Sequence, residues 1–278
     1  MEDESKAESF SLLSARDSDD FNDVFPSGFS DLYEIYSYRN AARILATACK
    51  SDFDEIVGRL IDFRIETDLV VRPGRNKSDI AKKIENAFNP IGWIETRIRG
   101  DLHIEKQYSQ VVERQLKSGP NKGSTVFKRM PATAKFKLLG VLDGHKVDFV
   151  KNRVALDFEW NSKDQTFDRD LYAMRAFYEC GIISSGVLIT RSSELAPLFR
   201  EISSRVEVKD FKSKFGASTT WMGKLTYRLD AGRAGGCPIL ALGIRPSVIS
   251  DFAQWKRANP VIRAPEFDLS DEEEIEDE

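Results

Sequence analysis

Helical spacing of apolar residues dominates the first third of the chain. Between residues 31 and 48 the apolar positions recur at roughly helical intervals, which predicts a helix. A second helix is predicted from about Ser51, and a third from the N-cap residue Ser78 to about Asn89, where Pro90 ends it. The pattern therefore predicts an N-terminal helical segment.

From Trp93 onward the pattern changes to alternating apolar and polar positions, which favours strands. We predict strands over residues 93–98, 103–108 and 136–141. The polar segment 115–131 contains glycine, proline and several lysines, so it is predicted to form an exposed basic loop.

The second half of the chain alternates strands and helices. A hairpin is predicted over residues 146–161 and a helix over 167–180, followed by a buried strand over 182–190. A further helix over 193–203 and a short apolar strand over 237–244 complete the pattern. A strand, a crossover helix and a second strand usually form a parallel pair, so the fold class is α/β with helices leading.

Composition and length fit a folded body with acidic ends. The chain has 278 residues, enough for one large domain, and we expect a single domain over 31–265 between disordered acidic segments at 1–30 and 266–278. No apolar run is long enough to span a membrane, and the acidic start lacks the apolar segment of a secretory signal. Three widely spaced cysteines favour a reducing, cytoplasmic location, and the absence of a Cys-x-x-Cys pair argues against zinc.

The overall charge of -4 conceals a basic body. Of 45 acidic and 41 basic residues, 18 acidic and two basic ones lie in 1–31 and 266–278, so residues 32–265 keep 27 acidic and 39 basic residues, a net charge of +12. Such a body suggests a polyanionic partner, with a lysine-rich solvated surface as the alternative.

Three acidic residues stand out on the predicted hairpin. Asp157 and Glu159 are two apart on one strand, so they point to one face while Phe158 and Trp160 point to the other. If the hairpin brings Asp148 alongside, three carboxylates share a small volume, which raises their pKa values unless a cation compensates. Clustered carboxylate oxygens suit a hard cation such as Mg²⁺.

The spacing of these acids resembles a nuclease motif. Asp148, eight residues, Asp157, one residue and Glu159 resemble the PD-(D/E)xK pattern, with Val147 in place of proline and Glu159 in place of lysine. The sequence around the motif is similar to the BglII-type restriction endonuclease family over roughly residues 31–250. The similar segments are Val147 to Asp164 continuing into Phe167-Asp-Arg-Asp-Leu-Tyr, Gly74-Arg-Asn-Lys-Ser, Gly92-Trp, Met222-Gly-Lys-Leu and Gly235-Gly-Cys-Pro.

The resemblance implies a restriction-endonuclease-like core, with a central mixed sheet flanked by helices. It also implies a type II restriction enzyme that cleaves a short palindromic site in duplex DNA with Mg²⁺. We expect a homodimer and a cognate DNA methyltransferase in the same restriction-modification system. Asp148 is assigned as the bridging metal ligand and Asp157 as the second, while Glu159 is either a ligand or the acceptor of a proton from water. Glu85 is the candidate for a fourth acidic group, and Glu95 is the alternative.

Basic and polar residues in three segments are candidate DNA contacts, because lysine and arginine bind phosphates and can also bind guanine edges. An ordinary surface position is the alternative for each of them. His145 lies next to the motif and could act as a base, and a plain turn residue is the alternative for it. The candidates are Asn161, Ser162, Lys163, Arg75, Lys77, Lys224, Arg228 and Arg233.

Two other function classes were weighed. A non-catalytic DNA-binding protein on the same scaffold would keep the basic body but would not need Asp148, Asp157 and Glu159 together. A glycoside hydrolase would use two carboxylates at a set separation, but the basic body argues against it.

Overall fold

The structure is a computed structural model that describes residues 22–72, 78–208, 211–216 and 218–265, without the side chains of 22, 143–145 and 212. It divides into two compact units, one made of Met1–Thr96 with His145–Glu278 and the other of Arg97–Gly144. The single folded domain expected over 31–265 stays a prediction. Most of the two acidic ends lies outside the described residues.

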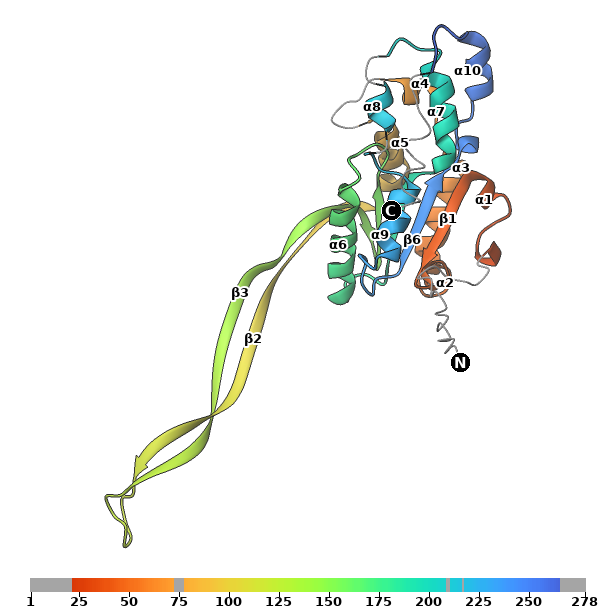
Figure 1. Ribbon diagram of the computed structural model, residues 1–278. Helices are drawn as coiled ribbons and strands as arrows, with labels where there is room; N and C mark the ends of the chain where they lie inside the picture. The colour runs from red at the N-terminus through yellow and green to blue at the C-terminus, as the bar shows by residue number, and fades with distance from the viewer. Residues whose placement is uncertain (1–21, 73–77, 209–210, 217, 266–278) are drawn as a thin grey trace, which may run out of the picture. The chain divides into compact units, whose positions relative to one another are not determined.

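The first unit is built on a mixed sheet, as the sequence predicted (Figure 1). In the described part of the chain the sheet has six strands in the order β1-β6-β5-β4-β3-β2. The central pairs β4–β5 and β5–β6 are parallel, while β1–β6 and β3–β4 are antiparallel. The strands are β1 (Tyr33–Tyr38), β2 (Ile94–Gln115), β3 (Thr125–Lys151), β4 (Val154–Phe158), β5 (Ser185–Arg191) and β6 (Ile239–Ile244).

Helices flank this sheet. The predicted helices over 167–180 and 193–203 are close to the observed ones, whereas the helices after residue 210 were not predicted. The predicted helix over 167–180 is α6 (Thr166–Glu179), which connects the parallel strands β4 and β5 as expected. The remaining helices are α1 (Phe29–Leu32), α2 (Ala41–Ala48), α3 (Lys50–Asp62), α4 (Thr67–Val71), α5 (Asp79–Phe88), α7 (Ala196–Ser203), α8 (Phe211–Phe215), α9 (Met222–Asp230) and α10 (Phe252–Ala258), with short 3-10 turns η1 (Asn22–Val24), η2 (Asn89–Ile91), η3 (Ser193–Leu195) and η4 (Pro246–Val248).

Helix α5 begins where the sequence predicted. The Ser78 side chain accepts a hydrogen bond from the Ala81 backbone N–H at 3.0 Å, which satisfies one of the free N–H groups of the first turn. Ile80, Ile84 and Phe88 recur every four residues and are buried, so one face of α5 packs into the core.

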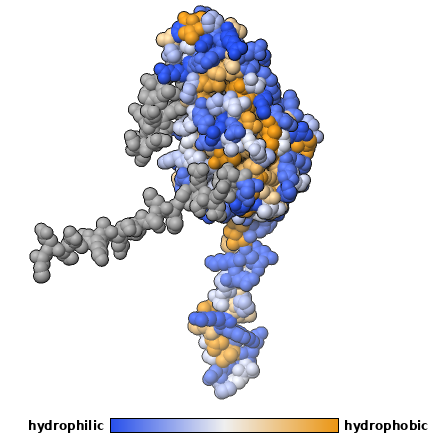
Figure 2. Space-filling model, turned by 90° about the vertical axis from the view of Figure 1, so that its right-hand side faces the viewer, coloured by the Kyte–Doolittle hydropathy of each residue, from blue (hydrophilic) through white to orange (hydrophobic). Residues whose placement is uncertain are grey.

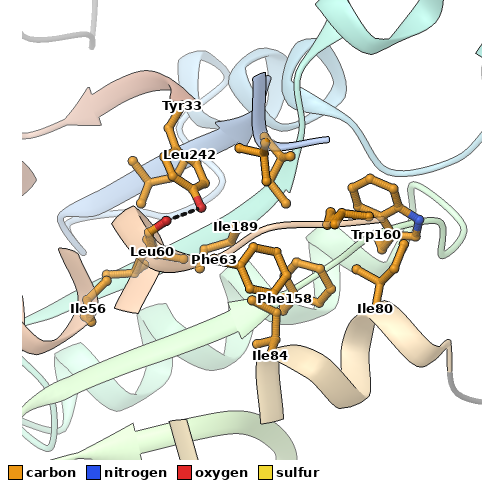
Figure 3. Close-up of a cluster of buried hydrophobic side chains, with 14 of the residues drawn as sticks. Tyr33, Ile56, Leu60, Phe63, Ile80, Ile84, Phe158, Trp160, Ile189 and Leu242 are labelled. Atoms are coloured by element: carbon orange, nitrogen blue, oxygen red, sulfur yellow. Dashed lines mark hydrogen bonds between the residues drawn. The ribbon is translucent and has the colours of Figure 1, made fainter. Parts of the chain in front are cut away.

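The core lies between these helices and the sheet (Figure 3). Tyr33 of β1 is fully buried, and its hydroxyl donates a 2.9 Å hydrogen bond to the Leu60 carbonyl of α3. On the other side of the cluster, Phe158 and Trp160 from the end of β4 lie against Ile80 and Ile84 of α5. The core therefore fixes α5 against the strand that carries the acidic residues.

Two predictions about early elements were wrong. Residues 33–38 form strand β1 rather than part of a helix, because their side chains bury against the core and their backbone pairs with β6, more than two hundred residues later. Arg39 and Asn40 have positive φ angles and make the turn into α2. Residues 22–30 include η1 and the start of α1, and Phe25 and Phe29 are buried, although this segment was expected to be disordered.

The predicted strands over 93–98 and 103–108 are one long strand, β2. Most of β2 and β3 forms the second unit, a two-stranded hairpin (Figure 1). Only residues 116–124 of the predicted basic loop 115–131 form its turn. Among the described residues, no helix has the length and apolar character needed to cross a membrane.

Candidate active site

The β3–β4 hairpin brings two of the three predicted acids together. Its register pairs Phe149 with Leu156 and Lys151 with Val154, so Asp148 and Asp157 stand opposite each other. The backbone N–H of Asp148 donates to Oδ1 of Asp157 at 2.7 Å, and Oδ2 of Asp148 accepts from the Phe158 N–H at 3.3 Å. The juxtaposition expected from the sequence is present.

The turn and base of this hairpin are anchored to α3. Asn152 adopts a positive φ of 48° in the turn, and its side chain donates to Asp52 at 2.8 Å. Lys151 binds the Glu55 carboxylate at 2.6 Å, and the indole of Trp93 donates to the same carboxylate at 2.9 Å. These contacts hold the strand that carries Asp148 in a fixed position.

Glu159 continues the line of β4. Its backbone N–H donates to the Ile189 carbonyl of β5 at 2.9 Å, so the parallel ladder extends one residue beyond the strand. The aromatic neighbours Phe158 and Trp160 are buried in the core with nearly parallel rings 6.5 Å apart. The alternation predicted from the sequence therefore separates the acidic face of this segment from its apolar face.

A pocket of about 400 Å³ opens beside these residues. Asp148 and Glu159 line it together with Glu85, which comes from α5. Glu85 is thus placed where the sequence analysis expected a fourth acid. The alternative, Glu95, forms an exposed ion pair with Lys146 at 2.5 Å and is not among the lining residues.

A further acid, Asp170 of α6, lies in the same cluster and was not predicted as a site residue. It is 1% exposed, and Arg169 lies 3.3 Å from its carboxylate and 3.8 Å from that of Glu159. In the sequence analysis Asp170 is only one position of the predicted helix over 167–180. Its spacing of three from Phe167 and four from Met174, both buried, was the available sign that it faces inward.

Burial and mutual repulsion raise the pKa values of this cluster. Burial, followed by the charges of Asp170 and Asp148, raises the pKa of Asp157 well above its usual range. Burial and the Asp148 charge raise the pKa of Glu159, against the opposing effects of the Ser162 hydrogen bond and Arg169. Burial and the Glu159 charge raise the pKa of Asp170 to about 8. The site is therefore short of positive charge.

The side chains of the acidic cluster are chemically suited to bind a hard divalent cation. They are carboxylates, and Oδ2 of Asp157 is buried without a hydrogen-bond partner among the described residues. In the part of the chain that the structure describes, no three His, Cys, Asp or Glu side chains form a group ready to hold a metal ion. A magnesium site does not require such a group, because Mg²⁺ usually keeps several waters and takes further oxygens from a substrate phosphate.

The predicted DNA contacts fall into three sets. Asn161 and Ser162 line the pocket, and Lys163 is exposed next to it in sequence. Lys224 is half-buried on α9. Arg75 and Lys77 lie outside the described residues, as does the side chain of His145.

Arg228 and Arg233 both form ion pairs within the protein. Arg228 is 7% exposed and forms ion pairs with Asp168 at 3.1 Å and Asp164 at 3.3 Å. Arg233 is exposed and pairs with Asp168. These contacts join α9 to the start of α6, a structural role that the sequence analysis did not foresee; DNA binding by either arginine stays a prediction.

Comparison with known proteins gave one family match. The sequence model described as Restriction endonuclease BglII/BglIII matches residues 33–244. No curated protein matches the chain. Among solved structures, the crystal structure of restriction endonuclease BglII complexed with a DNA 16-mer matches with 12% sequence identity over 77% of this chain and 76% of that chain, at a TM-score of 0.42.

Proposed function

The chain belongs to the BglII/BglIII family of restriction endonucleases, and we propose that it is a type II enzyme that cleaves duplex DNA at a short palindromic site with Mg²⁺. The observation that carries the proposal is the meeting of Asp148, Asp157 and Glu159 at one end of the β3–β4 hairpin, beside a pocket that Glu85 also lines. Asp148 comes from β3, Asp157 from β4, Glu159 directly follows β4, and Glu85 comes from α5. Such convergence is expected of a site that binds a cation and a phosphate.

Asp148 and Asp157 would hold the cation. When bound, a divalent ion neutralises charge on the phosphate and lowers the pKa of a bound water. The carboxylate of Asp148, which lines the pocket, and the buried Oδ2 of Asp157, which has no hydrogen-bond partner among the described residues, are the oxygens proposed for this role. Asp157 itself is not among the lining residues.

Glu159 would orient the attacking water or accept its proton. Its raised pKa brings it closer to neutral pH than an ordinary glutamate, which suits a general base. Arg169, 3.8 Å away, limits that rise and holds the carboxylate in place. Glu85 on the facing helix would complete the acidic lining.

The DNA would be bound through the basic body between the acidic ends, which carries a net charge of +12. Asn161, Ser162 and Lys163 follow the acidic strand and are the nearest candidates for contacts to DNA at the cleaved bond. A palindromic site is matched by a two-fold symmetric protein, so we propose a homodimer in the cytoplasm, paired with a cognate DNA methyltransferase.

Cleavage of supercoiled plasmid tests this function. The wild-type protein should give discrete linear fragments with Mg²⁺ and none with EDTA. Asp148→Ala and Asp157→Ala should each abolish cutting while leaving binding of the same DNA largely intact in a gel-shift assay. Asp54→Ala, which removes an exposed acid paired with Lys50 on α3, is the matched control and should cut normally.

Two outcomes would contradict the proposal. Full turnover in both site variants would remove the assigned roles. Binding without any cleavage by the wild-type protein would favour the non-catalytic DNA-binding protein on the same scaffold.

A further inference from the structure

The second unit, Arg97–Gly144, is a ribbon of two strands made of most of β2 and β3. Its turn is closed by a backbone hydrogen bond in which Leu116 N–H donates to Ser124 O at 3.0 Å. Every side chain of the ribbon that the structure describes is exposed or half-buried. A two-stranded ribbon has no interior of its own, so any function of this unit depends on its surface.

The charges of the ribbon are distributed unevenly along its length. Residues 97–144 hold ten basic and four acidic residues. Residues 97–105 and 135–144, called here the stem, account for four of the basic and three of the acidic ones. Residues 106–134, called here the distal ribbon, keep the other six basic residues and one acid, a net charge of +5. The basic residues of the distal ribbon are Lys106, Arg114, Lys117, Lys122, Lys128 and Arg129.

The positive charges of the distal ribbon are not neutralised within the protein. In the stem, Lys135 pairs with Glu105 at 3.5 Å and Lys137 with Asp101 at 2.8 Å. All six basic side chains of the distal ribbon are exposed, and among the described residues none of them forms an ion pair. Like charges held close together on one ribbon repel one another, so a polyanion that lies along them would be bound favourably.

The two faces of the ribbon also differ in charge. Side chains at alternate positions share a face, and the Lys135–Glu105 pair places odd positions of both strands on the same one. All four acids of the ribbon are at odd positions. The even positions of the two strands carry Lys106, Arg114 and Lys128 and no acid. The even face is therefore the more positive of the two.

Apolar side chains do not distinguish the two faces. Tyr108 and Met130 are exposed at even positions, and Val111 and Phe127 are exposed at odd positions. Figure 2 accordingly shows both hydrophilic and hydrophobic side chains on the side of the ribbon that it displays. Charge is thus the property that favours one kind of partner for the distal ribbon.

We propose that the distal ribbon is an arm that binds duplex DNA beside the cleaved site, with its even face toward the phosphates. The inference rests on the proposed function, because the DNA bound by the arm is the substrate. Duplex DNA carries about one negative charge per 1.7 Å of its length, which matches a row of unpaired cations. Contacts to phosphates carry no sequence information, so the arm adds affinity without changing the site that is cut.

The dimensions of the ribbon fit this role. Residues 97–115 of β2, at roughly 3.3 Å per residue, extend over about 60 Å. At 3.4 Å per base pair this equals the length of roughly 18 base pairs, of which a short palindromic site covers only a part. A two-stranded ribbon is also narrow enough to enter the major groove, which is about 12 Å wide. The arm is therefore long enough to reach DNA outside the site.

A binding titration in EDTA with random-sequence duplex DNA longer than the ribbon tests the arm. Arg114→Gln with Lys128→Gln removes two charges of the even face. Since each lost phosphate contact lowers the slope of log affinity against log salt by about 0.9, the slope should decrease by about 2 and binding should weaken roughly tenfold or more near 0.1 M salt.

The matched control is Lys135→Gln with Lys137→Gln, which changes the charge of the same ribbon equally but at the paired lysines of the odd face. It should leave the salt slope close to that of the wild-type protein. All four tryptophans lie outside residues 97–144, so their fluorescence should show the same thermal midpoint in all three proteins. Amide exchange within 106–134 should slow when the duplex is added to the wild-type protein.

Cleavage shows where on the DNA the arm binds. On duplexes that carry the cleaved site, kcat/KM of the wild-type protein should be higher with flanks of about 20 base pairs than with flanks of a few. Arg114→Gln with Lys128→Gln should lose this preference and still cut at the same position. A change in the cut position would overturn the proposal, since it would mean that the arm reads bases.

Equal salt slopes in the wild-type protein and both double variants would overturn the proposal, as would amide exchange of the distal ribbon that DNA does not slow. These measurements use no metal and no cleavage. Normal cutting without any effect of the even-face substitutions would refute the arm and leave the nuclease function. Binding that depends on the arm, without cutting under any condition, would have the opposite meaning.

Discussion

Replacing Asp170 by asparagine should stabilise the metal-free protein at neutral pH, because the buried acid is unfavourable in its charged form. Its pKa rises from a usual 3.8 to about 8 in the folded protein, with burial as the main cause. Between these values the unfolded chain has released the proton while the folded protein retains it. Folding therefore takes up a proton, and stability falls as pH rises through that window.

The size of the effect follows from the width of the window. A pH of about 7 lies roughly three units above the ordinary pKa of an aspartate in the unfolded chain. At 1.36 kcal/mol per unit, the buried acid therefore lowers the free energy of unfolding by at most about 4 kcal/mol. Part of this ceiling belongs to Asp157, because the charge of Asp170 is one cause of its raised pKa. We expect a gain of about 2 kcal/mol near pH 7 and less than 1 kcal/mol near pH 5.

Urea unfolding in EDTA, followed by tryptophan fluorescence at both pH values, measures this gain. Asparagine keeps an oxygen that can accept the bonds from Arg169, so the geometry of α6 is retained. Asp54→Asn, which removes an exposed charge paired with Lys50, is the control and should change stability by less than 1 kcal/mol at either pH. A loss of stability in Asp170→Asn that is equal at both pH values would refute the reasoning, since it would mean that Asp170 contributes contacts rather than a charge penalty.

Three further predictions follow from the same structure. In EDTA the melting temperature of the wild-type protein should decrease as the pH rises from about 5 to about 8, because the acids with raised pKa values ionise. Mg²⁺ should restore more stability at the higher pH. Scanning fluorimetry with and without Mg²⁺ checks both expectations, and a response to Mg²⁺ that does not depend on pH would contradict the crowding of charge. Gly186→Ala should destabilise the protein by more than about 1 kcal/mol in the same urea titration, because the added Cβ would lie 2.8 Å from Ile239 and still closer to Met174. Gly58→Ala, on the open face of α3, should instead stabilise it by about 0.5–1 kcal/mol. Equal effects of the two substitutions would refute the packing argument. DNA affinity should fall steeply between low and physiological salt in a binding titration, and a flat response would show that the basic body is not the contact surface.

The arrangement of the acidic residues on the hairpin could be predicted because it depends on residues that are close together in the sequence. A strand alternates its side chains, so Asp157 and Glu159 had to separate from Phe158 and Trp160, and a short connection had to return the chain past Asp148. Helix α6 and strand β5 were likewise predicted, since each has a long apolar pattern of a single period. The placement of Glu85 needed the core, which fixes α5 against the end of β4.

Elements that depend on distant partners were harder to predict. The apolar residues of 31–38 fit a helical spacing, and only pairing with β6 makes this segment a strand. Asp170 was an ordinary acid in a helix until the fold placed it beside Glu159. Arg228 looked like a free basic residue near glycines, but α6 supplies two acids that bind it inside the protein.

The order in which strands enter the sheet has a consequence for the newly made chain. The acids of β4 depend on β5 for backbone support, and β5 in turn lies against β6, which begins only at Ile239. A nascent polypeptide still lacking that last strand has every carboxylate of the pocket already synthesised but no finished sheet to hold them. Any nuclease activity would thus be delayed until β6 has been synthesised and has joined the sheet.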